Sequence, residues 1–205
     1  MGVEFEDSSC AGLSAGLLAE GVAVQDRFVP QARIHALIDC AQRRLGRGDF
    51  GAARIGSDHR LQRRAEIRGD HICWLDEPLF AEERALLSDL EQLRLELNAR
   101  AFLGLFDLEL HYAWYPPGAG YAPHVDQPMG REQRRVSLVL YLNHAWQPDD
   151  GGELRIFGPE GERDIEPIAG RLVCFLTAGR KHAVLPTRQT RLSITGWFRR
   201  REATQ

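Results

Sequence analysis

The chain has 205 residues, of which 43% are hydrophobic and 27% charged, and its formal net charge is −3. These values exclude a disordered chain, a collagen and a disulfide-stabilised miniprotein, and the acidic balance gives no electrostatic footprint for nucleic acid. The length favours a single domain over residues 1–205, large enough to bury a core without stabilising crosslinks.

The cysteines indicate the redox compartment. Cys10, Cys40, Cys73 and Cys174 lie far apart and form no C-x-x-C pair, so we expect reduced thiols in a reducing compartment. The N-terminal segment is acidic where a secretory signal is basic, and no apolar run approaches the ~18 residues needed to span a bilayer. We therefore expect a cytoplasmic protein with no membrane partner.

The first hundred residues are predicted to be mainly helical. The expected elements are a helix from Ser8 or Ser9 to Leu18, a strand over 22–29, and helices over 31–45 and 79–98. The second and third helices carry apolar residues three and four positions apart, which is typical of helices packed on a sheet. Between them, residues 43–68 combine arginines with glycines and predict a mobile basic segment. Two interpretations stay open for it, a solvated loop and a loop that contacts the substrate.

From residue 71 onward the pattern changes to short β-rich runs separated by Gly and Pro turns. The expected strands cover 71–75, 108–115, 136–142, 153–157, 171–176, 183–185 and 191–199. Many short strands with such turns favour a sandwich or a jelly roll.

The sharpest chemical motif is His124-Val125-Asp126. A lone H-x-D arises easily by chance, but His182 follows on a later expected strand. Residues i and i+2 share one face of a strand, so His124 and Asp126 can point inward together. Two imidazoles and one carboxylate on one face of a metal leave adjacent positions open, as in non-haem Fe(II) oxygenases.

The last expected strand places an arginine inside the fold. Arg191 and Trp197 fall on one face, and Ile194 and Phe198 fall on the other, which can pack against the helices. An inward arginine needs an anionic partner. Apart from Asp126 of the H-x-D motif, no inward position that we can assign carries an acid, so a bound dicarboxylate is an attractive partner.

A longer series of motifs runs through the second part of the chain. It comprises Ile67–Trp74, Tyr115–Gly118, Gly120–Pro128, Tyr141–Asn143, Gly151–Phe157 and Asp164–Pro167, followed by His182, Arg191 and Trp197. In order and spacing these motifs resemble the 2-oxoglutarate- and Fe(II)-dependent prolyl 4-hydroxylases related to the HIF prolyl hydroxylases. The similarity is greatest to the bacterial members, whose substrate is elongation factor Tu.

This resemblance implies a fold that is mainly β with supporting α, a double-stranded β-helix (jelly roll) with N-terminal helices packed on one sheet. Residues 67–198 would form the catalytic core, and residues 1–60 the helical support and the mobile basic segment. By the same resemblance, His124, Asp126 and His182 would bind Fe(II). Arg191 would pair with the distal carboxylate of 2-oxoglutarate, the co-substrate, helped by the hydroxyl of Tyr141.

The resemblance assigns further residues to the co-substrate pocket: Tyr115, Trp197, His111, Leu154 and Val184. For His111 we favour a hydrogen-bonded pocket or core histidine over a metal ligand. Tyr121, Arg134 and Asp70 are assigned to the substrate side. In the resembling hydroxylases the matching Asp and Arg form an ion pair that tethers the mobile loop, so we expect Asp70 to pair with Arg134. The alternative is that Asp70 caps the turn at Gly69.

The implied activity is hydroxylation of a prolyl residue in a protein of the elongation factor Tu type. Ascorbate is a candidate reductant, and we expect a monomer with no nucleic-acid partner. Two alternatives stay open: a 2-oxoglutarate oxygenase acting on a small molecule such as a free amino acid, and a non-catalytic cupin-like metal-binding sensor.

Overall fold

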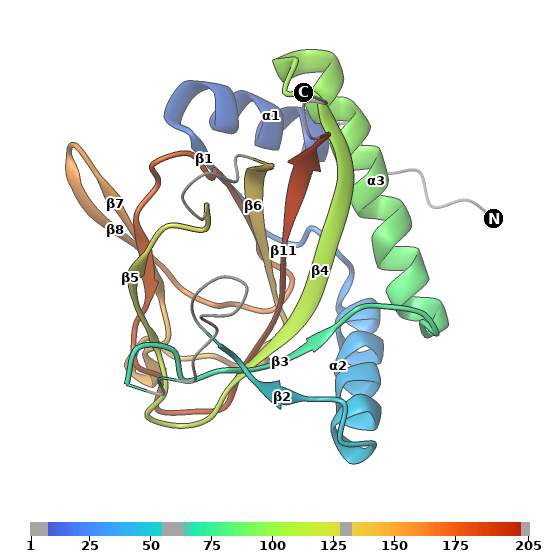
Figure 1. The fold of residues 1–205 in the computed structure, drawn as a ribbon, viewed down its shortest axis with the longest axis vertical. Coiled ribbons are helices and arrows are strands. Elements are labelled where there is room, and N and C mark those ends of the chain that lie inside the picture. Colours follow the sequence, from blue (N-terminus) through green and yellow to red (C-terminus); the bar gives the residue numbers. More distant parts are fainter. Residues whose placement is uncertain (1–7, 55–63, 65, 128–132, 202–205) are drawn as a thin grey trace.

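The computed structural model describes residues 8–54, 64, 66–127 and 133–201. Its helices are α1 (Ser8–Glu20), α2 (Gln31–Gly46) and α3 (Ala81–Ala101), with a short 3-10 turn over Pro148–Asp150. Its strands are β1 (Val22–Gln25), β2 (Gly51–Ala52), β3 (His71–Trp74), β4 (Leu105–Tyr115), β5 (Tyr121–His124), β6 (Arg134–Tyr141), β7 (Leu154–Gly158), β8 (Gly161–Ile165), β9 (Leu172–Leu176), β10 (His182–Val184) and β11 (Arg191–Arg200). Figure 1 shows their arrangement.

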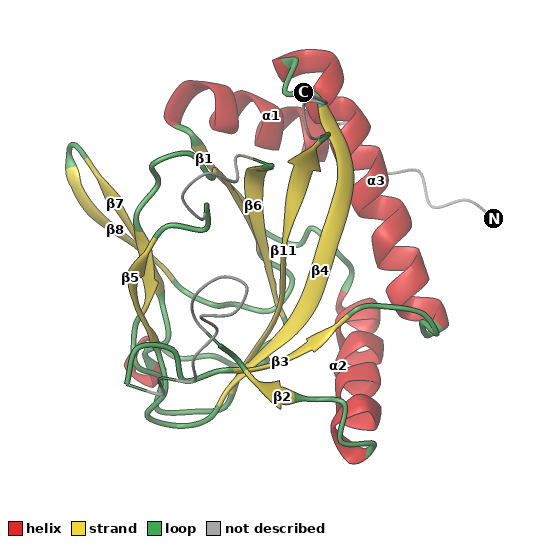
Figure 2. Cartoon of the chain, in the orientation of Figure 1, coloured by secondary structure: helices red, strands yellow, loops and turns green. Residues whose placement is uncertain are grey.

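Two antiparallel sheets form the body of the molecule. The larger has the order β1-β9-β6-β11-β4-β3-β2 and the smaller the order β5-β10-β7-β8. The smaller sheet faces one side of the larger sheet, and the helices lie on the opposite side of the larger sheet (Figure 2). The predicted double-stranded β-helix with helices on one sheet is therefore confirmed.

The helices cover the larger sheet through a continuous apolar core. On α3 every third or fourth residue points to the sheet, and Leu86, Leu90, Leu93 and Leu97 are each at most 1% exposed. This stripe packs with buried side chains of α2 and with the outward residues of β6 and β11, including Ile194 and Phe198. The leucines that recur three and four positions apart on α3 thus shield one face of the larger sheet from solvent.

A buried ion pair joins α2 to α3. Arg44, in the last turn of α2, donates hydrogen bonds of 2.7 Å from Nε and Nη2 to the Glu83 carboxylate. Glu83 also accepts a hydrogen bond from the backbone N–H of Phe80, which caps the start of α3. The expectation of a mobile basic segment over 43–68 is therefore wrong at its beginning, because Arg43 and Arg44 belong to a helix. Residues 55–63 and 65 of that segment lie outside the described residues.

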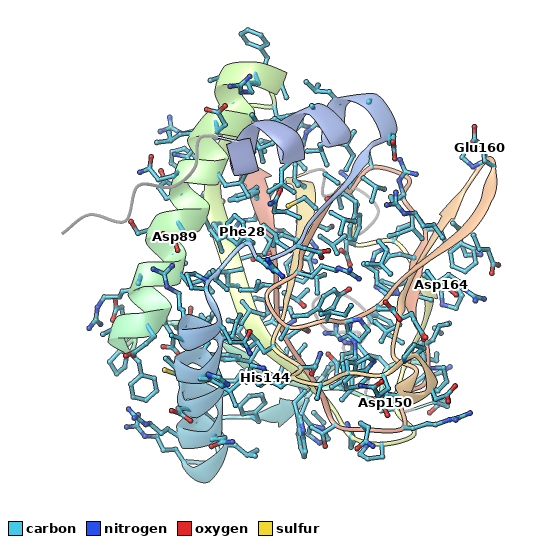
Figure 3. The ribbon with its side chains drawn as sticks, turned by 180° about the vertical axis from the view of Figure 1, so that it is seen from behind. Phe28, Asp89, His144, Asp150, Glu160 and Asp164 are labelled. Carbon is cyan, nitrogen blue, oxygen red and sulfur yellow. The ribbon has the colours of Figure 1, made fainter. Side chains whose placement is uncertain are left out.

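The structure adds three strands that the sequence did not predict: the two-residue β2, and β5 and β8. β8 forms a hairpin with β7, but four of its five residues are exposed, so it lacks the apolar alternation that marks a strand. Figure 3 shows Glu160 at the tip of this hairpin and Asp164 along its second strand. β5 contains Pro123, which an edge strand tolerates because its missing N–H faces away from the ladder.

Three of the four cysteines are described with their side chains: Cys40 and Cys73 are free thiols and are buried, and Cys174 is buried as well. Cys10 lies among residues whose side chains are not described. Among the described residues, no helix is both long enough and apolar enough to cross a membrane.

Candidate active site

A pocket of about 810 Å³ lies between the two sheets. The predicted metal-binding residues His124, Asp126 and His182 line it together with Arg191. Its walls come from the inward faces of β4, β6, β9 and β11 on one side and from β5, β7 and β10 on the other. Residues from distant parts of the chain thus meet in one cavity, as the sequence predicted.

The three candidate metal ligands come from two paired strands of the smaller sheet. His124 ends β5, His182 begins β10, and the two residues are direct partners across the ladder. Asp126 follows β5, and its Oδ1 lies 3.5 Å from Nε2 of each imidazole. The ligand atoms all lie within 4.8 Å of one another, so two nitrogens and one oxygen surround a common point.

The hydrogen bonds of the imidazoles fix their tautomers. Nδ1 of His124 lies 2.8 Å from the carbonyl oxygen of Ala122, and Nδ1 of His182 lies 3.1 Å from that of Arg180. Because a carbonyl only accepts, each Nδ1 carries a proton and each neutral ring presents its Nε2 lone pair to Asp126. Three electron-pair donors aimed at one point repel each other unless a cation lies between them. The donor set therefore fits a divalent metal such as Fe(II).

Without a metal, the three side chains shift one another's pKa values. Burial is the largest influence on the pKa of Asp126 and would raise it, but His124 and His182 together hold that pKa well below its usual value. Burial lowers the pKa of His124. Burial also acts to lower the pKa of His182, and Asp126 outweighs it and raises that pKa. The carboxylate is therefore ionised and ready to bind a cation.

Arg191 is 2% exposed and holds the other end of the pocket. Its Nε donates a hydrogen bond of 2.8 Å to the carbonyl oxygen of Gly152, and its guanidinium lies about 5 Å from the ring centroids of Tyr115 and Tyr141. None of the described acidic residues pairs with it. A buried guanidinium without a carboxylate partner is costly, so this end of the pocket fits an anionic ligand.

Tyr141 supplies a second unpartnered polar group beside Arg191. Its hydroxyl is buried and has no hydrogen-bond partner. Tyr141 is fully buried and is not among the residues that line the pocket, but its ring packs against the Arg191 guanidinium. A hydroxyl and a forked guanidinium together match the two oxygens of a carboxylate. Since the other end of the cavity carries the triad, the residues fit the dicarboxylate 2-oxoglutarate, with one carboxylate at Arg191.

The other expected pocket residues also line the cavity: Tyr115, Leu154, Val184, Trp197 and His111. His111 is packed between two indoles, with ring centroids 4.9 Å from Trp74 and 5.4 Å from Trp197. Its Nδ1 is buried without a hydrogen-bond partner, so the expectation of a hydrogen-bonded histidine is wrong at this nitrogen. It is not part of the metal cluster that the described residues form.

The expected ion pair between Asp70 and Arg134 does not form. Asp70 accepts hydrogen bonds of 2.8 and 3.0 Å from Arg68, whereas Arg134 donates to Glu109 at 2.8 Å. Each side chain has a nearer partner. Arg68 is only two residues from Asp70 in the sequence. The Arg134 guanidinium lies 3.5 Å from the ring centroid of Trp197, and Glu109 is opposite Trp197 in the β11–β4 register. Asp70, Arg68 and Arg134 nevertheless line the same pocket.

Tyr121, which the resemblance assigns to the substrate side, lines the pocket and contacts the metal cluster. The Tyr121 ring stacks on the His124 ring at a centroid distance of 3.5 Å. The Arg68 guanidinium also contacts Tyr121, at 4.9 Å from its ring centroid. An isolated bridge pairs Arg68 with Tyr121 along the backbone. Tyr121 therefore links the segment before β3 to a metal ligand.

Ser137 is a functional residue that the sequence analysis missed. Its hydroxyl donates to Oδ2 of Asp126 at 2.7 Å. A signal was present, because Ser137 alternates with Val139 and Tyr141 along β6 and so shares their inward face. A small polar residue among inward apolar positions on that face indicates a partner inside the cavity.

Residues 110–199 match the 2OG-Fe(II) oxygenase superfamily. The chain is 34% identical to human Egl nine homolog 1 over 190 residues, covering 87% of this chain and 43% of that protein. It is 36% identical to the mouse prolyl hydroxylase EGLN3 over 163 residues, covering 74% of this chain and 64% of that protein. The chain thus spans less than two thirds of these relatives.

Solved structures extend the similarity over nearly the whole chain. A Pseudomonas putida prolyl-4-hydroxylase is 43% identical with a TM-score of 0.86, over 94% of this chain and 99% of that one. A Trichoplax adhaerens prolyl hydroxylase, in complex with a hypoxia inducible factor oxygen degradation domain peptide fragment, is 27% identical with a TM-score of 0.84, over 93% of this chain and 88% of that one.

The jelly roll, the His-Asp-His cluster and the buried arginine define a non-haem iron oxygenase of the 2-oxoglutarate-dependent class. Within that class, the chain belongs to the prolyl 4-hydroxylase family.

Proposed function

We propose that this protein hydroxylates a prolyl residue of a protein substrate, with 2-oxoglutarate and O₂ as co-substrates. In the balanced reaction 2-oxoglutarate is oxidised to succinate and CO₂. One oxygen atom of O₂ enters succinate and the other enters a C–H bond of the prolyl ring. The bacterial members that this chain resembles act on elongation factor Tu, and we propose a substrate of that type.

Arg191 is the observation that carries the proposal. It is a buried guanidinium that no described carboxylate neutralises, at the far end of a cavity whose other end presents three metal-binding atoms. A metal-binding sensor needs no such arginine. A dicarboxylate that spans the cavity satisfies both ends.

The residues of the chain have separable roles in this reaction. Fe(II), when bound by His124, Asp126 and His182, supplies the redox chemistry that activates O₂. The Nδ1 protons of the two histidines hold the rings in the metal-binding tautomer. Arg191 and the Tyr141 hydroxyl bind and orient the distal carboxylate of 2-oxoglutarate, and orientation of the reactants lowers the entropic part of the barrier.

The mouth of the pocket supports a macromolecular substrate. Trp74 and Val125 line the pocket and are 41% and 46% exposed. The exposed Arg54 lies on the same rim. Large apolar side chains exposed around a cleft mark a protein-binding surface more often than a site for a small polar metabolite.

The proposal is tested by incubating the purified protein with Fe(II), 2-oxoglutarate, ascorbate and bacterial elongation factor Tu. We expect succinate release and one added oxygen atom on a single proline, located by peptide mass spectrometry. Asp126→Ala is the matched control and should give neither product.

The alternatives give different results. Oxidation of a free amino acid, with no modified proline in elongation factor Tu or in a cell lysate, would establish a small-molecule oxygenase. Metal binding without succinate release from any substrate would establish a sensor. A modified proline in a different lysate protein would retain the prolyl hydroxylase and replace its substrate.

A further inference from the structure

We propose that Trp146 is a positioning residue for the co-substrate pocket: from outside that pocket, it holds the turn whose carbonyl fixes Arg191. The inference rests on the proposed role of Arg191 in binding 2-oxoglutarate. Trp146 does not line the triad pocket. It lines a second cavity of about 720 Å³, between α2 and the outer face of the larger sheet.

The two cavities lie on opposite faces of the same strands. Arg191 is opposite Tyr115 in the β11–β4 register, and both side chains reach the triad pocket. The next pair along, Leu192 opposite Trp114, lines the second cavity. The loop that carries Trp146 runs from His144, which contacts the first turns of α2, to Asp150 (Figure 3).

Two successive carbonyls connect Trp146 to Arg191. The Trp146 indole Nε1 donates a hydrogen bond of 3.0 Å to the carbonyl oxygen of Gly151. The carbonyl oxygen of the next residue, Gly152, accepts the 2.8 Å hydrogen bond from Nε of Arg191. A displacement of the Gly151 peptide therefore moves the group that sets the direction of the guanidinium.

This turn has a backbone conformation that needs external support. Gly151 and Gly152 both have φ near +70°, a region that favours glycine and leaves the backbone more freedom than other residues allow. A Cβ at Gly152 would lie 3.0 Å from Cδ of Arg191 and 3.2 Å from Thr187, so the turn passes very close to the arginine. On the far side of the turn, the Gly152 N–H donates to Pro186 at 3.2 Å.

Arg191 has few other restraints. Another hydrogen bond, from Nη1 to the Ser193 hydroxyl, is 3.4 Å long, and the rings of Tyr115 and Tyr141 pack about 5 Å from the guanidinium. Among the described residues, Gly152 is thus the close partner that orients the guanidinium. An ordered fork binds a carboxylate with less loss of side-chain entropy than a free one.

The test replaces Trp146 by Phe, which keeps an aromatic ring and removes the N–H donor. Trp114→Phe is the matched control, because Trp114 lines the same cavity but makes no indole hydrogen bond to a described residue. Binding of 2-oxoglutarate is measured by calorimetry on the Zn(II)-loaded proteins, which do not turn over. Losing one hydrogen bond of ordinary strength should weaken 2-oxoglutarate binding about 3- to 10-fold in Trp146→Phe and leave Trp114→Phe unchanged.

Kinetics separate positioning from general destabilisation. In the Fe(II) enzyme, Trp146→Phe should raise the apparent KM for 2-oxoglutarate by the same factor, while kcat and the KM for the protein substrate change by less than about twofold. Equal 2-oxoglutarate affinity in Trp146→Phe and wild type, or an equal loss in both variants, would overturn the inference. If wild-type protein binds Zn(II) but not 2-oxoglutarate, the proposed function itself fails.

A measurement on the unmodified protein covers the case in which Trp146→Phe does not fold. Coupling between two sites is reciprocal, so 2-oxoglutarate should in turn stabilise the Trp146 indole hydrogen bond. Addition of 2-oxoglutarate to the Zn(II)-loaded protein should slow hydrogen exchange at the Trp146 indole N–H, observed by NMR, and leave the Trp114 indole unaffected. Unchanged exchange at Trp146 would contradict the proposal.

Discussion

Ser137 and Asp126 form the hydrogen bond that decides which carboxylate oxygen faces the metal site. The Ser137 hydroxyl donates to Oδ2 at 2.7 Å, so Oδ1 is left to face Nε2 of His124 and His182. Ser137 is buried, and its oxygen lies 3.1 Å from the Thr177 hydroxyl, which is fully buried as well. The pair of hydroxyls therefore fixes the rotation of the carboxylate before any metal binds.

Removal of this hydroxyl should weaken metal binding. Groups that orient a ligand side chain typically contribute 10–100-fold in metal affinity, and we expect about that loss of Fe(II) or Mn(II) affinity in Ser137→Ala, measured by metal titration. Ser193→Ala is the control, because Ser193 is buried in the adjacent strand but contacts Arg191 and Thr195. The same metal affinity in both variants would show that Asp126 is oriented by other contacts.

Each metal ligand should be indispensable for turnover and dispensable for folding. The three side chains lie on or directly after β5 and β10 and are not part of either of the two larger apolar cores. His124→Ala, Asp126→Ala and His182→Ala should therefore abolish succinate formation while circular dichroism stays native. His35→Ala, at an exposed position of α2, should keep full activity. Substantial turnover in any of the three variants would remove that residue from the ligand set.

The predictable parts of the site are those that depend on strand alternation. The alternation of side chains along a strand predicted that Arg191 and Trp197 face inward from β11 and that Ile194 and Phe198 face the helices. The structure places the first two in the pocket and the other two in the core beneath the helices. The position of the H-x-D motif could likewise be derived from residues i and i+2, although β5 itself was not recognised, because Pro123 and its short length disguise an edge strand.

The pairing of charged side chains could not be predicted from the sequence. Arg134 can reach several carboxylates, and its choice of partner depends on a strand register that no local sequence pattern encodes. In β11, Arg199 is opposite Arg134 of β6 on one side and opposite Asp107 of β4 on the other. Glu109 accepts hydrogen bonds from both arginines. The sequence likewise contains no signal that links Trp146 to Arg191, since their connection runs through two backbone carbonyls.

Arg191→Lys should weaken 2-oxoglutarate binding. A lysine ammonium is a point charge and cannot reproduce the two-pronged hydrogen bonding of a guanidinium. Disrupting a buried charge pair costs ~2–5 kcal/mol, which predicts a loss of affinity between roughly 30-fold and several thousandfold. Direct binding to the Zn(II)-loaded protein measures it. Arg155→Lys, in an ion pair on the β7–β8 hairpin, is the control and should bind normally; unchanged affinity in Arg191→Lys would place the distal carboxylate elsewhere.

His111 should make the stability of the protein depend on pH. Burial, followed by the positive charge of Arg68, lowers the pKa of His111 from 6.5 to about 3. Below pH 6.5 an unfolded chain protonates this imidazole, whereas the folded protein does not until the pH approaches 3. The unfolded state thus binds more protons in this window, and the free energy of unfolding should fall as the pH is lowered, by up to about 1.4 kcal/mol per pH unit from this group.

His111→Gln removes the titrating group and keeps a polar side chain of similar size. Urea unfolding of metal-free protein between pH 4 and 7 should give a flatter dependence on pH for His111→Gln than for wild type, with the two curves separating below about pH 6.5. The remaining ionisable groups are the same in both proteins, so their contributions cancel in the difference. His35→Gln, which changes an exposed histidine, should follow wild type. Parallel curves for His111→Gln and wild type would mean that His111 takes up its proton in the folded protein, and that the ring between the two indoles is accessible to water.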